Sequence, residues 1–260
     1  MLNLLSKIKN KILKKIYFRE FKSYRDASNF CNKINKNNYE NNFLNEYRLK
    51  KFLINEKDIP FINAPSYKFL NDSISFYLSK YNSFPNILDI GGSFGEGALY
   101  LRSIFKEVNI KYSILESKKM VELSNQTKND IKFYDDLELA LHEIKPDFIF
   151  SSSTLQYLPD PYKVIDTLNK SNAKMISLTR NSFSDNTYFF SQVSYLKSNG
   201  SGKHLEEFGN PMILYPHTVL DKKKLNSYLT NYKIILQKKT DDFKIFEKSF
   251  CEDLLYIIIN

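Results

Sequence analysis

The sequence predicts an α/β fold in which a doubly wound parallel sheet follows a helical extension and carries one insert. From residue 86 onward, short apolar runs alternate with segments of helical spacing, the pattern of parallel strands joined by crossover helices. Before that residue, strand-like alternation is sparse. Between residues 182 and 220 the alternation fails, which indicates an inserted cap. We therefore expect a helical extension over residues 1–85 and an α/β domain over residues 86–260.

Composition limits the class of protein. The chain has 260 residues, 42% of them hydrophobic, which is enough for one α/β core with an extension. Cys31 and Cys251 lie far apart without metal-ligand spacing, so we expect no disulfide framework, no metal and a reducing, cytoplasmic location. No apolar run reaches membrane-spanning length. The formal net charge is +9, but no zinc knuckle, RNP motif or helix-turn-helix signature accompanies it, so we expect no nucleic-acid partner.

Residues 1–19 are rich in lysine and contain no acidic residue. Beneath the basic side chains, Leu5, Ile8, Ile12 and Ile16 recur at helical spacing. One interpretation is a surface helix that contacts a partner or anionic lipid at the inner face of a membrane. The other is a helix packed on its own domain with its lysines in water, and this is the simpler expectation.

Between the basic segment and the sheet, the chain is expected to be mostly helical. Ser23 is a suitable N-cap for a first helix. Residues 47–54 and 67–81 again show apolar residues at helical spacing, on either side of a turn bracketed by Pro60 and Pro65. We expect these helices to cover the edge of the sheet or to close over a ligand.

The clearest motif is residues 86–97, N-I-L-D-I-G-G-S-F-G-E-G, which reads as a strand, a turn of small residues and the start of a helix. Asp89 lies near the end of the strand, and Gly91 and Gly92 allow a ligand to approach the backbone closely. The next apolar run ends in Glu116. Because an acidic side chain at the tip of the second strand binds both hydroxyls of a ribose, these features predict a nucleoside cofactor.

The spacing of this turn, D-x-G-x-S-x-G, differs from that of the dinucleotide fingerprint and of the phosphate loop. A carboxylate before a turn without a pyrophosphate cradle suits a phosphate-free ligand with a cationic amino group, such as S-adenosylmethionine. The segment resembles motif I of the class I methyltransferases. This resemblance implies their Rossmann-like sheet, a cofactor contact for Ser93, and Ser117 beside the ribose-binding Glu116, with S-adenosylhomocysteine as the product.

Residues 91–95 also spell G-x-S-x-G, the nucleophile elbow of α/β-hydrolases, with Ser93 as the nucleophile. That fold needs several strands before its elbow and an oxyanion loop of the H-G-G-G kind. The first 85 residues offer few strands, and no such loop occurs. The context therefore favours the cofactor turn, and a hydrolase remains the alternative.

A third strand is expected over residues 131–134, ending in Asp135 and Asp136. Under the methyltransferase resemblance, an acidic residue at this position accepts a hydrogen bond from the adenine amino group. Either aspartate is equally suited to cap the helix expected over residues 137–144. Both interpretations stay open.

The later elements continue the alternation and close with an antiparallel hairpin, which class I methyltransferases add to their doubly wound sheet. The hairpin loop is expected to pass through Asp241 and Asp242. The expected strands are residues 146–150, 173–178, 232–237 and 254–259, with a helix over residues 162–169.

Five segments spread over nearly the whole chain carry a narrower resemblance. They are F-x-S-Y-x-x-A from Phe21, D-I-G-G from Asp89, S-S-T-L-Q-Y from Ser152 with Asp160-Pro161 after it, Arg180, and Y-P-H from Tyr215. The chain is similar in these segments to a family of methyltransferases from bacterial surface-polysaccharide genes, those of capsule and O-antigen. The resemblance implies O-methylation of a sugar or of a nucleotide- or phosphate-linked precursor in capsule or lipopolysaccharide biosynthesis. It also assigns Ser152 and Gln156 to the cofactor.

A sugar hydroxyl needs a general base, and the chain has three histidines. His217 in the insert is the first candidate and His204, after a glycine-containing loop, is the second; the alternative for each is a structural hydrogen bond. His142 lies within an expected helix and is most simply structural. Arg180 is suited to hold the phosphate or carboxylate of an anionic small-molecule acceptor, or to pair with a nearby aspartate. With so few histidines, a non-catalytic cofactor-binding partner of another methyltransferase is a further alternative.

Overall fold

The computed structural model describes residues 16–34, 42–58, 65–106, 108–240 and 245–259. The lysine-rich residues 1–15, the turn before Pro65 and the loop through Asp241 and Asp242 lie outside these ranges. The expectations for those segments, including contact with a membrane, therefore stay predictions. Within the described ranges, every helix is too short or too polar to span a bilayer.

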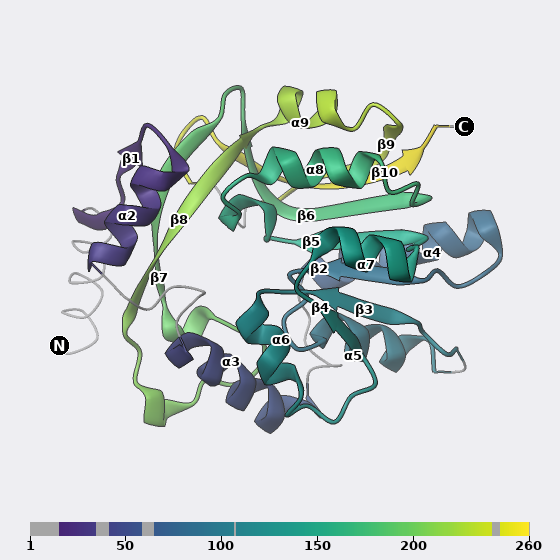
Figure 1. Cartoon of the computed structure of the whole chain (residues 1–260), viewed down its shortest axis with the longest axis horizontal. Helices are drawn as coiled ribbons and strands as arrows, with labels where there is room; N and C mark the ends of the chain where they lie inside the picture. The colour runs from purple at the N-terminus through teal and green to yellow at the C-terminus, as the bar shows by residue number, and fades with distance from the viewer. Residues whose placement is uncertain (1–15, 35–41, 59–64, 107, 241–244, 260) are drawn as a thin grey trace.

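Five parallel strands form the centre of the sheet (Figure 1): β2 (Ile87–Ile90), β3 (Tyr112–Leu115), β4 (Lys132–Tyr134), β5 (Phe148–Ser152) and β6 (Met175–Ser184). Their order in space is β4-β3-β2-β5-β6. The chain therefore winds outward from β2 to β4 on one side and from β5 to β6 on the other, and it reverses direction between β2 and β5. The predicted doubly wound α/β fold is confirmed.

Two antiparallel strands complete the sheet beyond β6. β10 (Phe250–Ile258) pairs with β6, and β9 (Tyr232–Thr240) pairs with β10. This is the closing hairpin that the sequence predicts. Cys31 and Cys251 are both buried, and no disulfide joins them.

Helices cover both faces of the sheet, which gives three layers (Figure 1): α4 (Pro65–Tyr81) and α5 (Glu96–Ile104) on one face, and α7 (Leu137–Ile144), α8 (Pro161–Asn169) and α9 (Lys222–Tyr228) on the other. Because successive strand residues point to opposite faces, Ile87 packs with α4 and α5, whereas Leu88 and Ile90 pack with α7, α8 and α9. Asp89 therefore lies on the face covered by α4 and α5.

Local caps fix where several helices begin. Ser23 caps α2 (Tyr24–Ile34), since its Oγ accepts a hydrogen bond from the Asp26 backbone N–H at 3.1 Å. Asp136 caps α7 by accepting from the Leu139 N–H at 2.8 Å. The first helix and α7 thus begin where the sequence predicts.

A smaller sheet grows from the end of β6 and forms a cap (Figure 1). β5 covers one edge of β6 only as far as Thr179, whereas β10 covers the other edge. β8 (Met212–Asp221) takes the vacated edge at Phe183 and Ser184 and runs parallel to β6. β6 thus runs beyond the end expected at residue 178, because its last residues belong to the cap.

The cap joins segments from both ends of the sequence. β7 (Tyr188–Tyr195) pairs with β8, and β1 (Glu20–Phe21) pairs with β7, both antiparallel. α2 packs against β7 and β8. The predicted insert is therefore made largely of strands, and the extension that was expected to be helical contributes a strand to it.

α3 (Asn42–Asn55) lies beside α6 (Lys118–Ser124) and holds one loop of the insert. Lys51 is 2% exposed, and its Nζ donates to the backbone carbonyls of Asn199 at 2.9 Å and Gly200 at 2.8 Å. Asn55 accepts from the Lys203 N–H at 3.0 Å. These bonds fasten the loop over residues 197–203 to the N-terminal extension.

Candidate functional site

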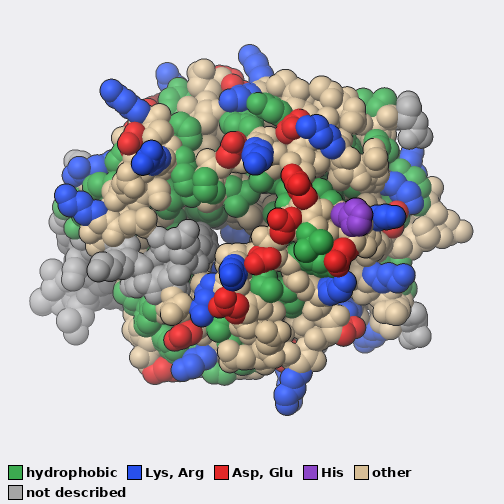
Figure 2. All heavy atoms as spheres, in the orientation of Figure 1, with side chains coloured by type: hydrophobic (Ala, Val, Ile, Leu, Met, Phe, Trp, Pro, Cys, Tyr) green, Lys and Arg blue, Asp and Glu red, His purple; other side chains and the backbone are tan. Residues whose placement is uncertain are grey.

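The polar residues that the sequence singles out gather at the carboxyl ends of the parallel strands. Gly91 follows β2, Glu116 follows β3, Asp135 follows β4, and Ser152 ends β5. The chain reverses its direction of winding between β2 and β5, and ligands of open α/β sheets bind in the crevice at such a point. On the face in Figure 2 basic and acidic side chains are interspersed, and the surface is hollowed near its middle.

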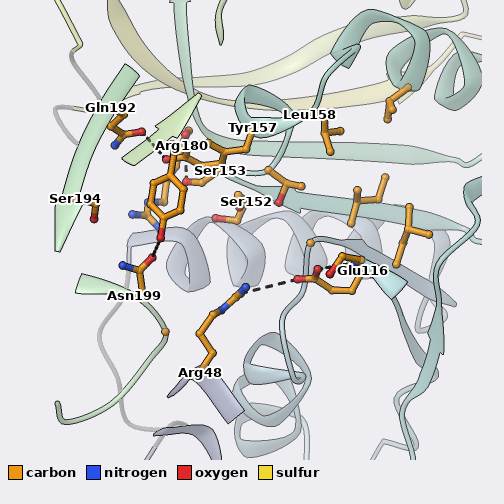
Figure 3. Close-up of a pocket in the computed structure, with 18 of the residues that line it drawn as sticks. Arg48, Glu116, Ser152, Ser153, Tyr157, Leu158, Arg180, Gln192, Ser194 and Asn199 are labelled. Atoms are coloured by element: carbon orange, nitrogen blue, oxygen red, sulfur yellow. Dashed lines mark hydrogen bonds and ion pairs between the residues drawn. The ribbon is translucent and has the colours of Figure 1, made fainter. Parts of the chain in front are cut away.

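A cavity of about 650 Å³ occupies this crevice (Figure 3). Its floor is formed by the strand ends, including Gly91, Glu116 and Ser152. The cap supplies the opposite wall, with Gln192 from β7 and Tyr215 from β8. The cavity thus extends from the sheet to the insert, and its size is that of typical small-molecule sites.

Glu116 is held in a fixed orientation at this cavity. Its Oε1 accepts from the Ser93 N–H at 3.2 Å and its Oε2 from the Ser117 N–H at 3.0 Å. Arg48 of α3 reaches toward it across the cavity, with Nη2 3.9 Å from Oε1 (Figure 3). Both side chains are 12% exposed. Two backbone donors therefore orient a carboxylate that has further lone pairs for hydroxyl donors.

A second cavity of about 230 Å³ adjoins the first and shares Gly91, Ser152 and Arg180 with it. Asp89 and Glu96 line this smaller space together with two arginines, Arg48 and Arg180. It thus offers charges of both signs, the complement of a zwitterion such as an α-amino acid.

Asp89 is 3% exposed and accepts a hydrogen bond from the Tyr112 hydroxyl at 2.6 Å. Burial raises the pKa of its carboxyl to about 7, although the Tyr112 bond acts in the opposite direction. Glu96 is also buried, and desolvation raises its pKa. Two carboxyl groups therefore lie in this cavity where a cationic partner would stabilise their ionised forms.

The turn between the two cavities requires glycine. Gly91 has φ +79°, and a Cβ there would lie 2.0 Å from Thr154 Oγ1. At Gly92 a Cβ would lie 2.5 Å from Asp89 Oδ2. The small residues of the motif thus allow β2, β5 and the Asp89 carboxyl to approach one another closely.

Arg180 lies where β6 passes from the central sheet to the cap. Its φ is +56°, in the left-handed region that side chains rarely adopt, and its backbone N–H donates to Asp253 Oδ1 at 2.8 Å. β10 has a register shift between Glu252 and Leu254 opposite this point. The irregular backbone accompanies a guanidinium that lines both cavities.

Gln192 lies on the cap side of the larger cavity. Its Oε1 is 2.8 Å from the Tyr157 hydroxyl and 2.8 Å from His217 Nδ1. His217 is fully buried behind it, and burial lowers the pKa of the imidazole to about 3. The histidine is therefore neutral at physiological pH.

Most of the predicted site residues line the cavities. Asp89, Gly92 and Ser93 line the smaller one, Glu116, Ser117 and Asp135 line the larger one, and Gly91, Ser152 and Arg180 line both. For the pair left open on the sequence, Asp135 contacts the cavity and Asp136 is the helix cap.

Four predicted residues lie outside the cavities. Asp136 caps α7, and Gln156 is fully buried with its Oε1 accepting from the Ser182 N–H at 3.0 Å. His204 Nδ1 is 2.8 Å from the Tyr47 hydroxyl, in contact with a core cluster. His217 contacts Gln192 from behind and does not line either cavity. The structure therefore gives neither histidine the position of a base that touches an acceptor, because each is engaged within the protein.

The sequence did not point to Arg48, Tyr67 or Gln192 as site residues. Arg48 lies on α3 between the buried residues Tyr47 and Leu49, and the packing of that helix on α6 brings it to the cavity. Tyr67 lines the smaller cavity and stacks on Tyr100, with ring centroids 5.1 Å apart. Gln192 is a half-buried residue of β7, whose burial does not alternate, so no sequence signal identifies it.

The hydrolase alternative needs a histidine beside Ser93. All three histidines of the chain fall within the described ranges, and none of them lines the cavity that contains Ser93. His142 is exposed on α7. The Ser93 backbone N–H instead donates a hydrogen bond to Glu116 Oε1. The arrangement is that of a ligand-binding turn, without the base of a nucleophile elbow.

No family model matches the chain, and no curated protein matches it in sequence. Similar solved structures include a S-adenosylmethionine-dependent methyltransferase from Clostridium acetobutylicum ATCC 824, 11% identical with a TM-score of 0.47 over 81% of this chain and 98% of that one. The N-terminal domain of EvdMO1, with S-adenosylhomocysteine bound, is 12% identical with a TM-score of 0.47 over 76% and 82%. Magnesium protoporphyrin IX methyltransferase (ChlM) from Synechocystis PCC 6803, with S-adenosylmethionine bound, is 14% identical with a TM-score of 0.43 over 74% and 79%. These identities are too low to transfer residue roles to this chain.

Proposed function

We propose that the chain is an S-adenosylmethionine-dependent methyltransferase that methylates an oxygen of a small anionic acceptor. The observation that carries this proposal is the pair of adjoining cavities at the point where the sheet reverses. One contains an oriented carboxylate at the tip of the second strand, and the other contains charges of both signs. In an adenosine joined to an amino acid, the ribose corresponds to the cavity with the oriented carboxylate and the zwitterionic amino acid to the cavity with charges of both signs.

The larger cavity supplies contacts for an adenosine. Glu116 presents lone pairs to two ribose hydroxyls, and Asp135 is available to an adenine amino group. Leu115 and Leu137, the sequence neighbours of Glu116 and Asp136, line the same cavity and offer apolar surface to a base. No phosphate-binding loop accompanies these groups, which favours a phosphate-free nucleoside.

The smaller cavity supplies contacts for the amino-acid end. Asp89 and Glu96 complement an ammonium group, and Arg48 and Arg180 complement a carboxylate. The same glycine turn borders both cavities, so a single ligand can occupy the two at once.

S-adenosylmethionine supplies an electrophilic methyl group when it is bound. The residues of this chain then have to align an acceptor oxygen and exclude water. The cap wall, with Tyr157, Gln192 and Tyr215, encloses the remaining part of the larger cavity for that acceptor. Arg180 carries the charge that would hold an anionic group.

For the acceptor itself we propose a sugar or a nucleotide- or phosphate-linked precursor of envelope polysaccharide, as the sequence resemblance implies. Arg180 and the two tyrosine rings of the cap wall support this class, because guanidinium groups bind phosphate or carboxylate and aromatic faces pack on sugar rings. A cytoplasmic enzyme that touches the inner face of the membrane through residues 1–19 would be consistent with such a precursor.

Isothermal titration calorimetry with S-adenosylhomocysteine tests the proposal. We expect binding to the native protein and a loss of about tenfold or more in Glu116→Ala, since hydrogen bonds to a charged group are worth about 1.5–3 kcal/mol. Glu138→Ala, an exposed glutamate on α7 outside both cavities, is the matched control. Absence of binding, or equal affinity in both variants, would reject the assignment.

The two alternatives give different results. A hydrolase would cleave a simple ester and lose that activity in Ser93→Ala. A non-catalytic partner would bind S-adenosylhomocysteine with the same dependence on Glu116, yet transfer no labelled methyl group to any component of an envelope-precursor extract.

A further inference from the structure

Gln192 is held by two hydrogen bonds that converge on one of its atoms. The Tyr157 hydroxyl donates to Oε1 at 2.8 Å, and His217 Nδ1 lies 2.8 Å from the same oxygen. Tyr157 is itself held in place, because its backbone carbonyl accepts from the Tyr24 hydroxyl of α2 at 2.5 Å. β8, α2 and the turn after β5 that carries Tyr157 thus together determine the position of one amide on β7.

These contacts also determine which way the amide faces. An amide oxygen only accepts, so His217 must carry its proton on Nδ1 and donate it. Its Nε2 is then the unprotonated nitrogen, which agrees with a buried Nε2 that has no hydrogen-bond partner among the described residues. Both lone pairs of Gln192 Oε1 are occupied, and the amide NH₂ group is left for the cavity that Gln192 lines.

Neighbouring groups of this wall use their hydroxyl protons within the protein. The Tyr215 hydroxyl donates to Asn199 Oδ1 at 2.7 Å, and Ser153 Oγ donates to the Arg180 carbonyl at 3.3 Å. The Tyr157 proton is spent on Gln192. Two donors of this part of the cavity are therefore the Arg180 guanidinium and the amide NH₂ of Gln192, beside the Ser194 hydroxyl, which can both donate and accept.

We propose that Gln192 is a specificity-determining residue that donates to a carboxylate or phosphate oxygen of the acceptor, with His217 and Tyr157 as the positioning residues that fix its amide. The inference rests on the proposed function in taking this end of the cavity as the acceptor site. The carboxylate and the phosphate share the feature that is recognised, an anionic oxygen that only accepts hydrogen bonds.

Calorimetric titrations of the S-adenosylhomocysteine-loaded protein test the inference with three sugar probes. Glucuronate and glucose 1-phosphate carry the two candidate anions, and glucose carries none. We expect at least one anionic probe to bind about tenfold or more tightly than glucose, and the stronger of the two distinguishes carboxylate from phosphate. If neither anion binds better than glucose, the inference is wrong.

Gln192→Glu supplies the direct test of the amide. Tyr157 and His217 still donate to one carboxylate oxygen, but the other now faces the cavity as an acceptor with negative charge. We expect anion affinity to fall about tenfold or more while S-adenosylhomocysteine affinity is unchanged. Unchanged anion binding would overturn the inference even if the cofactor arm succeeds. The converse outcome is a protein that binds the anions through Gln192 and shows no affinity for S-adenosylhomocysteine. That result would reject the proposed function but support Gln192 as a donor to an anionic ligand.

The positioning role is tested by rescue. His217→Leu removes one donor and lets the amide rotate, so anion affinity should fall about fivefold or more, whereas His217→Asn can donate from nearly the same place and should restore it. Tyr157→Phe, which removes only a hydroxyl, should weaken anion binding similarly and serves if the leucine variant fails to fold. Equal anion affinity in His217→Leu, or in Tyr157→Phe where it is the variant that folds, would contradict the positioning role.

Discussion

Asp89 shows at the scale of one residue how the site and the stability of the fold are linked. Its carboxyl is buried and accepts from Tyr112, and burial raises its pKa from 3.8 to about 7. Between these two pH values the unfolded chain releases the proton while the folded chain keeps it. The folded state therefore binds more protons in this range, and stability must fall as the pH rises.

The stability prediction follows from that sign. From pH 4 to pH 7, the Asp89 contribution should lower the free energy of unfolding by on the order of 4 kcal/mol, and it should change little above pH 7. Asp89→Asn removes this titration. Urea unfolding of both proteins at pH 5 and pH 8 measures the difference between them. If the free energy of unfolding changes equally with pH in the native protein and in Asp89→Asn, the buried carboxyl is not the cause of the pH dependence.

Cofactor binding should depend on pH in the opposite direction. If the ammonium group of S-adenosylhomocysteine pairs with ionised Asp89, the proton must leave before the pair forms. Affinity should then fall by up to about tenfold per pH unit below pH 7. Calorimetry in two buffers of different ionisation enthalpy should detect about one proton released at pH 6. Asp89→Asn should bind more weakly at pH 8 and lose the pH dependence.

Gly91 gives a third residue-scale prediction. Alanine there would keep an unfavourable positive φ, worth about 1–3 kcal/mol, and would also place a Cβ against Thr154. Gly91→Ala should therefore unfold at lower urea concentration and lose S-adenosylhomocysteine binding. Gly200→Ala is the matched control for stability, because φ is +71° there and the nearest atom, Lys51 Cδ, lies 3.6 Å from the added Cβ, an ordinary contact. Equal destabilisation in the two variants would show that the contact with Thr154 is unimportant.

The sequence predicts the position of residues that depends on strand order, and it misses the position of residues that depends on packing. Asp89 lies near the end of one apolar run and Glu116 directly follows the next, so their place at the carboxyl edge of the sheet follows from local pattern. His217, which follows Tyr215 and Pro216 in the insert, is the first candidate for a base on the sequence, yet it is fully buried. Its burial comes from β7 and α2, which are distant in sequence, and no local pattern reports such contacts.

At the scale of the element, α3 connects the two functional walls. Arg48 lines both cavities. Lys51, one turn further along the helix, donates hydrogen bonds to backbone carbonyls of the loop over residues 197–203. Burial lowers the pKa of the Lys51 ammonium, with Glu96 acting in the opposite direction. A buried cation that satisfies several carbonyls is costly to remove, because those carbonyls would be left unpaired.

Lys51→Met tests this connection. We expect a loss of about 2–4 kcal/mol in the free energy of unfolding, and faster hydrogen exchange confined to residues 197–203. Affinity for S-adenosylhomocysteine should also fall, because this loop borders both cavities. Lys50→Met, its exposed neighbour on the same helix, is the control. Unchanged exchange in the loop would mean that α3 does not hold it.

Elements were predictable from the sequence where burial is regular. β2 and β5 read as apolar runs because central parallel strands are buried on both faces. β7 (Y-F-F-S-Q-V-S-Y) mixes aromatic, polar and small residues, and the aliphatic residues of β8 are interrupted by Tyr215, Pro216 and His217. Both strands contact α2, and Gln192 and Tyr215 also line the cavity. Without a regular period, they resemble a loop, and the sequence accordingly predicts only an insert there.

At the scale of the whole molecule, the cap depends on a contact between the start of the chain and its middle. Phe18 stacks on Phe190 with ring centroids 5.0 Å apart, and the Ser191 N–H donates to the Arg19 carbonyl at 2.9 Å. Tyr24 then bonds the Tyr157 carbonyl. Asp89 and Glu116, by contrast, belong to the central sheet and its turns, and α3 holds the insert loop that borders the same cavities. The cofactor contacts therefore do not involve β1 or α2.

Removal of residues 1–34 should therefore separate acceptor binding from cofactor binding. The truncated chain loses β1 and α2, whose buried apolar side chains contribute about 3 kcal/mol or more, and its unfolding midpoint should fall accordingly. Binding of anionic sugar probes should be lost with the Tyr24–Tyr157 support, whereas S-adenosylhomocysteine affinity should stay within about threefold, a difference below 1 kcal/mol. Removal of residues 1–15 alone is the control and should change neither. If the longer truncation loses both ligands equally, the prediction is wrong. Cofactor binding at Glu116 and Asp89 would then depend on residues 1–34, although neither β1 nor α2 contacts these two side chains.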